Sequence, residues 1–225
     1  MGVTLDFLTL LPYASELVRG LTTTVILTVV TTLTGIALAV VVAYLRLHGR
    51  SWTRFCMGSY VEVTRNTPFI VQLFFIFFGL PGLGIQIDAI TAAFLAMTLN
   101  LAAYSAEILR AGIGATAQGQ LEAARALGMT RLQSYRHVVL IPAFARVYPA
   151  LISQSVIVML GSAVVSQISV FDLTYAANFI QSRNFRSFEV YLVITLAYLL
   201  LAFVMRRVFM LAGNRLFAYQ QGESR

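Results

Sequence analysis

The sequence predicts an all-α membrane protein with five transmembrane helices and one polar loop between the third and the fourth. Of its 225 residues, 59% are apolar and only 11% are charged, whereas soluble domains carry about 25% charged residues. Apolar runs of membrane-spanning length recur along the chain, and arginines gather at their ends. A compact soluble fold of this size would have too little interior for so much apolar surface, so we expect that surface to face lipid.

Five segments have about the 20 apolar residues that a helix needs to cross the hydrocarbon core. We expect spans at 21–45, 57–80, 88–109, 143–168 and 190–211, with a polar loop at 111–137. The second span ends at the turn signal Pro81-Gly82-Leu83-Gly84. Residues 5–17 have loosely helical apolar spacing, which fits either a short interfacial helix or a frayed leader. Residues 1–225 are expected to form a single transmembrane domain.

The distribution of arginine predicts the orientation. All sixteen basic residues are arginine, and the net charge is +7. One side of the membrane receives Arg46, Arg50, Arg54, Arg110, Arg125, Arg131, Arg136, Arg206, Arg207 and Arg215, and the other receives Arg19, Arg183 and Arg186. Because positive residues accumulate on the inner side, the N-terminus is expected outside, the C-terminus in the cytoplasm and the polar loop in the cytoplasm. This pattern also argues against a nucleic-acid-binding stripe.

The composition argues against catalytic and metal sites. The chain has one cysteine, Cys56, and two histidines, His48 and His137, in separate segments. A nucleophile with its base, or a metal cluster, needs more convergent residues than these. A self-sufficient channel or secondary transporter would place charges near the midplane and often show an internal repeat. Neither is visible, so we predict no catalytic and no metal residues.

The polar loop predicts two short helices joined at a glycine. Helix formers fill Gly119 to Leu127, Gly128 can adopt the left-handed conformation that ends a helix, and Thr130 can cap a second helix reaching Tyr135 or beyond. Alanines 123, 124 and 126 would let another surface approach closely, and the charged side chains of this loop could fix its register. A solvated loop between two spans is the alternative.

This loop resembles the EAA loop of ABC importer permeases, through Glu122-Ala123-Ala124 and Gly128. Further blocks resemble the polar amino acid uptake group, namely Arg65-Asn66-Thr67-Pro68 with Val71-Gln72-Leu73-Phe74, Ala103 to Gly112, Gly119-Gln120, and Ala126 to Thr130. The resemblance covers Leu21 to Phe217. Permeases for other small solutes, such as methionine or an opine, remain the main alternative within this class.

The resemblance implies a type I ABC importer permease fold in the bacterial cytoplasmic (inner) membrane. The chain would pair with a second permease subunit as a homodimer or heterodimer, and an external solute-binding protein would deliver an amino acid. Docking on a cytoplasmic ABC ATPase dimer would use Gly119, Glu122, Ala123, Ala124, Arg125, Gly128 and Arg131. ATP and Mg would bind that partner and not this chain, which has no lysine and no Gly-rich phosphate loop.

The chain departs from the family pattern at two places. The proline expected at Ile141 stands one residue later, at Pro142, where it can still begin a helix. Many relatives carry Lys-Asp-Thr-Ser-Leu where this chain reads Leu160-Gly161-Ser162-Ala163-Val164. Charge recognition would then lie elsewhere or in the partner subunit, and a heterodimer is one explanation.

Polar residues inside the spans are candidates for a gate and a substrate path. Glu62 and Arg65, and likewise Glu107 and Arg110, are three residues apart and share a helix face, so a four-membered gate-side cluster is one hypothesis and simple pairing at the interface another. Possible path residues are Asn100, Gln154, Gly161, Ser162 and Gln167, although such side chains often bond neighbouring helices instead. Asp172, Arg183, Arg186 and Glu189 are expected in an outer loop.

Overall fold

The computed structural model describes residues 5–216, and every regular element in that range is helical. In chain order these are η1 (Phe7–Tyr13), α1 (Ala14–His48), α2 (Ser51–Arg65), α3 (Phe69–Gly82), α4 (Ala89–Gly114), α5 (Gln118–Ala126), α6 (Arg131–Gln133), η2 (Ser134–Leu140), α7 (Ile141–Gly161), η3 (Ser162–Ile168), α8 (Leu173–Asn184) and α9 (Ser187–Leu216). The 3-10 helices are η1 and η3, and η2 is a π-helix. The predicted positions of the two chain ends, and Phe217 at the end of the resemblance, lie outside the described residues.

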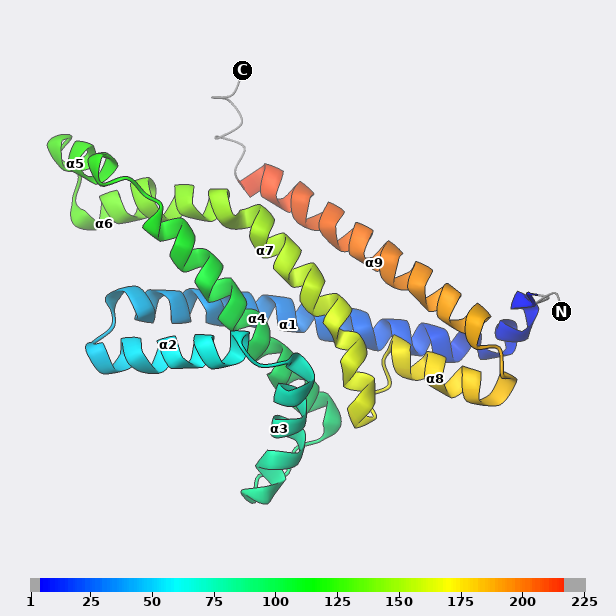
Figure 1. Cartoon of the computed structure of the whole chain (residues 1–225). Coiled ribbons are helices and arrows are strands. Elements are labelled where there is room, and N and C mark those ends of the chain that lie inside the picture. Colours follow the sequence, from blue (N-terminus) through cyan, green and yellow to red (C-terminus); the bar gives the residue numbers. More distant parts are fainter. Residues whose placement is uncertain (1–4, 217–225) are drawn as a thin grey trace.

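Four helical runs are long and apolar enough to cross a membrane, at 7–48, 89–114, 131–168 and 187–215. The helices α2 and α3 pass the same test only as a bent pair, so the structure fits the five-span prediction when this pair is counted as one broken span. In Figure 1, α5 and α6 lie at one end of the molecule, while η1 and α8 lie at the other. The elements that could meet a cytoplasmic partner are thus separated from those expected outside.

The centre of the bundle is the crossing of α1 and α4 (Figure 1). Both helices bury small side chains there, which lets two backbones approach closely in a membrane. The buried residues of α1 include Thr24, Thr31, Gly35 and Ala39, and those of α4 include Ala92, Ala96, Ala103 and Ala106. At Gly35 an added Cβ would lie 2.9 Å from Leu101 Cδ2, so the close approach depends on glycine there.

The second span is broken, which corrects the prediction of one continuous helix over 57–80. The helix α2 ends at Arg65, α3 begins at Phe69, and the two are bent by 112°. Pro68 accounts for the break, because a proline disfavours helical conformation in the preceding residue and has no N–H to continue the ladder. Asn66 and Thr67 then donate side-chain hydrogen bonds to carbonyls of the last turn of α2, at 2.8 Å each.

The prediction of a separate second short helix in the polar loop is wrong, because this helix continues into the fourth span. From Arg131 the chain stays helical through α6, η2, α7 and η3 as far as Ile168. Pro142 is the second residue of α7 and directly follows the π-helix η2, so it lies inside this rod instead of beginning a helix, and it removes one hydrogen bond from the ladder. The third span is also longer than predicted, because α4 continues past Leu109 to Gly114. One helical rod therefore runs from the polar loop into the fourth span.

The segment after the fourth span, which was expected to be an outer loop, contains the helix α8. The side chain of Asp172 accepts a hydrogen bond from Tyr175 N at 2.8 Å and so caps α8. Asp172 and Glu189 are 0% and 2% exposed. Glu189 accepts a hydrogen bond from the backbone N–H of Asp6 at 3.2 Å and pairs with Arg186. These two carboxylates are therefore bonded within the chain, at the end of the molecule that holds η1 and α8.

Candidate functional site

A helical loop of residues 118–133, called the docking loop below, protrudes at one end of the molecule (Figure 1). Its turn forms where Gly128, with φ 76°, takes the left-handed conformation, which glycine adopts without steric cost. Gly128 N donates to Arg125 O at 3.0 Å and Met129 N to Ala124 O at 3.1 Å. Thr130 then starts α6 with a capping box shared with Gln133. The expected glycine stop and threonine cap are both present.

The two faces of the docking loop differ. Its outward face carries Gly119, Glu122, Ala123, Arg125, Gly128 and Arg131, all exposed. Glu122 has a hydrogen bond only with Gln118 among the described residues. Ala124 is 3% exposed, which corrects its assignment to the docking surface, since it packs within the chain instead. Leu127 and Leu132 also belong to the exposed surface, since their side chains are 82% and 76% exposed. This was not predicted from the sequence, although two leucines beside a polar turn could have indicated an apolar docking surface.

The predicted charge cluster forms only in part. Glu107 binds Arg110 through both carboxylate oxygens, and it also binds Arg46 of α1, a partner that the sequence did not reveal. Neither Glu62 nor Arg65 forms a salt bridge within residues 5–216. The four-membered cluster is therefore wrong. Its place is taken by a triplet that ties α1 to α4, because Arg46 reaches across from the end of α1.

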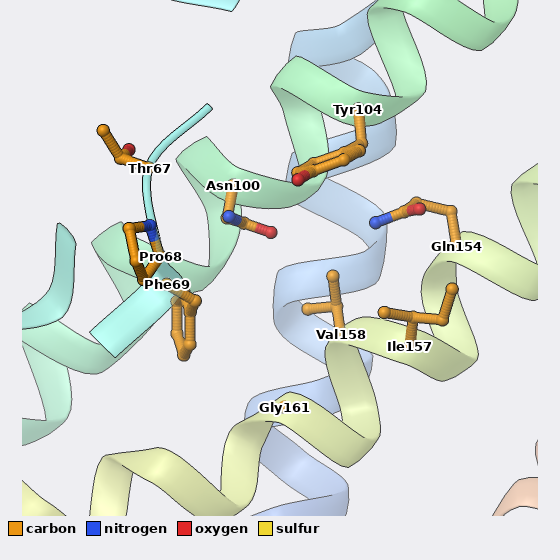
Figure 2. A pocket seen from close by; sticks show the side chains of 9 residues that line it. All are labelled: Thr67, Pro68, Phe69, Asn100, Tyr104, Gln154, Ile157, Val158 and Gly161. Carbon is orange, nitrogen blue, oxygen red and sulfur yellow. The ribbon is translucent and has the colours of Figure 1, made fainter. Parts of the chain in front are cut away.

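A pocket opens where the second span breaks, between α3, α4 and α7. Its volume is about 330 Å³, and it is lined by Thr67, Pro68, Phe69, Asn100, Tyr104, Gln154, Ile157, Val158 and Gly161. Figure 2 shows Asn100 and Tyr104 on one side and Gln154 on the other, with their polar atoms directed between them. This volume is at the lower end of the range of small-molecule sites. We call it the break pocket.

A hydrogen-bond network supports the break pocket. Gln72 Nε2 donates to Thr64 O at 2.7 Å and to Thr67 O at 3.0 Å, and so satisfies carbonyls released where α2 stops. Asn100 Nδ2 donates to Gln72 Oε1 at 3.0 Å. Unpaired backbone groups at membrane depth are costly. The network therefore stabilises the break and fixes Asn100 at the pocket wall.

Three of the five predicted path residues, Asn100, Gln154 and Gly161, line the break pocket. Ser162 does not, since it is fully buried and donates to Met159 O at 2.6 Å. Gln167 lies outside it, on η3. Tyr104 was missed as a lining residue, although it stands inside the motif block Ala103 to Gly112.

Arg65 lies beside the pocket and not in it. Its guanidinium carbon is 5.7 Å from the centre of the Tyr104 ring, and Tyr104 Oη donates to its backbone carbonyl at 3.2 Å. Asn66 is exposed and does not line the pocket either, whereas Thr67 and Pro68 of the same motif line it. The motif Arg65 to Pro68 therefore shapes the break and one wall.

The lining of the break pocket has the chemistry to bind a small polar molecule. Its lining contains hydroxyl, amide and aromatic groups but no carboxylate, imidazole or thiol. Within residues 5–216, no three His, Cys, Asp or Glu side chains gather as metal ligands would. Such a pocket can hold a small polar molecule through hydrogen bonds.

Comparison with known proteins gives concordant results. Residues 14–217 match the family described as "Binding-protein-dependent transport system inner membrane component". The chain is 35% identical to the probable glutamine ABC transporter permease protein GlnM of Bacillus subtilis over 73% of this chain and 76% of that protein. It is 33% identical to the arginine transport system permease protein ArtQ of the same organism, over 89% and 92%. A crystal structure of an amino acid ABC transporter with histidines shares 37% identity, covers 95% of this chain and all of that chain, and has a TM-score of 0.86.

Proposed function

Because this chain belongs to the family of inner membrane components of binding-protein-dependent transport systems, we propose that it is the permease subunit of an ATP-binding-cassette importer for a polar amino acid. The observation that carries the proposal is the docking loop, which is exposed and whose helix α5 is followed by the glycine turn of the EAA pattern at Gly128. Its relatives include permeases named for glutamine and arginine. The chain itself is a non-catalytic subunit.

The docking loop supports coupling to a separate ATPase dimer, which would bind ATP and Mg. Glu122, Arg125 and Arg131 offer charge-assisted hydrogen bonds, and Leu127 and Leu132 offer apolar surface at the turn. The loop continues directly into the rod from Arg131 to Ile168. Movement of an ATPase against the loop would therefore be transmitted to α7, which carries Gln154 and Gly161 of the break pocket.

The break pocket is the proposed substrate site of this subunit. Gly161 occupies the position where many relatives have an acidic residue, and an added Cβ there would meet nothing within 4 Å. The glycine thus leaves the pocket open and uncharged on the side of α7. A second permease subunit, identical or related, would complete the path, and an external binding protein would deliver the amino acid. The N-terminus would lie outside and the C-terminus in the cytoplasm.

Charge reversal at Glu122 tests the proposal. In cells producing the permease with its ATPase and binding protein, Glu122→Lys should abolish uptake of radiolabelled glutamine and arginine, because repulsion at the docking surface prevents ATPase binding. The amount of the variant in the membrane should stay unchanged, since Glu122 is exposed. Glu16→Lys, at the opposite end of the molecule, is the matched control. Undiminished uptake by Glu122→Lys would contradict the coupling role.

A further inference from the structure

A second hollow, between α1 and α9, shares no residue with the break pocket or the docking loop. Its volume is about 360 Å³, and threonine is the only polar residue type in its lining. One face of each helix forms a wall, and these faces consist of Val25, Thr28, Val29, Thr32 and Leu33 of α1 with Leu201, Val204, Met205, Val208 and Phe209 of α9. We call it the α1–α9 groove.

The groove exists because α1 and α9 pack on different neighbours. The helix α1 packs mainly on α4, α9 packs on α7, and both contact α8. Figure 1 shows the two helices diverging from α8. Thr28 and Thr32 are each 5% exposed and form the floor, whereas Leu33 and Val208 are 69% and 59% exposed and form the rim. Both helices belong to membrane spans, so the rim opens toward lipid.

Positive charge lies near one end of the groove. Arg215 is seven residues after Val208, so it lies on the groove face of α9, about two turns nearer the end of that helix. Arg206 and Arg207 lie on other faces of α9. All three arginines are exposed, and none forms a salt bridge with another described residue. Arginine is costly in hydrocarbon and extends toward the headgroup region instead, where Arg215 can meet a phosphate.

A lipid fits this groove better than a protein helix does. Spanning helices pack on one another through small residues, and the α9 wall has none, since it consists of leucine, valine, methionine and phenylalanine. A second copy placed groove to groove would also bring its own arginines toward those of this chain, and like charges at an interface are unfavourable. An acyl chain matches the apolar walls, and an anionic headgroup matches Arg215.

We propose that the α1–α9 groove binds an anionic phospholipid, with one acyl chain between Thr32 and Val208 and the phosphate at Arg215. The inference does not depend on which solute the permease carries. In the orientation proposed above, the lipid belongs to the cytoplasmic leaflet. A basic side chain near an anionic membrane surface contributes roughly fivefold to association. The groove therefore prefers phosphatidylglycerol, which carries a net negative charge, over zwitterionic phosphatidylcholine.

Photocrosslinking of the complete permease–ATPase complex in phosphatidylcholine nanodiscs tests the proposal. The probes are trace amounts of phosphatidylglycerol or phosphatidylcholine with a diazirine in the acyl chain, and peptide mass spectrometry locates the adducts. Phosphatidylglycerol should label residues 25–33 and 201–209 about fivefold more than phosphatidylcholine does, and excess unlabelled phosphatidylglycerol should remove the difference. Equal labelling by the two probes would show ordinary surrounding lipid, and no labelling by either would show that protein covers the groove. Both results would overturn the proposal.

Substitutions at Arg215 test the position of the headgroup. Arg215→Gln should lower labelling by phosphatidylglycerol about fivefold, whereas Arg215→Lys should retain the preference. Arg207→Gln removes the same charge from another face of α9 and is the matched control. Equal losses in Arg215→Gln and Arg207→Gln would indicate diffuse attraction and contradict a site at Arg215.

A substitution that fills the groove tests the position of the acyl chain. Val208 is exposed, so Val208→Trp should leave assembly with the ATPase intact, which copurification checks. The larger side chain should lower labelling of residues 25–33 by phosphatidylglycerol to the level of phosphatidylcholine. Unchanged labelling in this variant would place the acyl chain elsewhere and refute the site.

Discussion

Asp172 shows how a single buried carboxylate can serve the fold. It has no exposed surface, caps α8, and lies 3.2 Å from the hydroxyl of Tyr198, which donates to it. Burial raises the pKa of Asp172 from 3.8 to about 6, because an ionised carboxylate is disfavoured where water is excluded. Gly20 of α1 packs against the same residue, since an added Cβ would lie 2.7 Å from Asp172 O.

Asp172→Asn should flatten the dependence of stability on pH. A carboxyl whose pKa is higher in the folded state than in the unfolded chain binds its proton more tightly when folded. The contribution of Asp172 to the free energy of unfolding is therefore greatest below pH 3.8. It declines as the pH rises toward about 6, by about 3 kcal/mol at most. Asparagine retains the cap without the charge. Thermal unfolding in detergent between pH 4 and 7 measures this, and parallel curves for both proteins would refute it.

The close packing of α4 against α7 depends on a glycine, Gly112. An added Cβ at Gly112 would lie 2.3 Å from Val147 Cγ1, whereas one at Gly114 would meet nothing within 4 Å. Valine cannot rotate freely out of the way. Gly112→Ala should therefore lower the free energy of unfolding by about 1–3 kcal/mol, while Gly114→Ala should be neutral or stabilising. Equal melting temperatures for the two variants would contradict this packing.

Among the elements, the broken second span shows what the sequence can and cannot reveal. Pro68 and the polar residues before it indicate a break in the helix at this position. The bend of 112° is not predictable from them, because it depends on Gln72 reaching two carbonyls and on Asn100 reaching Gln72 from another helix. The π-helix η2 was also not predicted, since its residues Ser134–Leu140 carry no local signal that separates a π-turn from an α-turn.

The substitution Gln72→Leu tests whether this hydrogen-bond network stabilises the break between α2 and α3. The change leaves the carbonyls of Thr64 and Thr67 and the amide of Asn100 without their partner. Each buried polar group left unpaired costs roughly 1–3 kcal/mol, so the melting temperature should fall and amino acid binding should weaken with it. Gln118→Leu, an exposed substitution in the docking loop, should leave both unchanged. Normal stability of Gln72→Leu would show that the break does not depend on this network.

At the scale of the whole molecule, a single rod connects the docking loop with the break pocket. It starts at Arg131, passes through η2 and carries Gln154 and Gly161. The sequence predicted the loop, its glycine stop and several pocket residues, because these depend on local propensity and recognisable motifs. It did not predict the continuity of the rod or the pairing of Arg46 with Glu107, because both depend on how distant segments meet.

Gly128→Val should uncouple transport from ATP hydrolysis by the partner ATPase without unfolding the permease. Valine at φ 76° is strained by about 1–2 kcal/mol, so the turn that presents the docking surface should distort. We expect loss of transport and of substrate-stimulated ATP hydrolysis, with the melting temperature lowered by only about 2–8 °C, since nothing packs on this glycine. Gly58→Ala, in α2 with open space around it and outside the docking loop, should behave as wild type. Full coupling in Gly128→Val would disprove the role of the turn.

The separation of the docking loop from the break pocket has a consequence for how such permeases diversify. The loop consists of residues 118–133, and the pocket is built from residues 67–69, 100, 104 and 154–161, so the two share no residue. Mutations that adapt the chain to a different motor subunit need not alter its cargo preference, and the reverse also holds. A chimera that exchanges only residues 118–133 between two permeases should therefore acquire a new ATPase while keeping its amino acid.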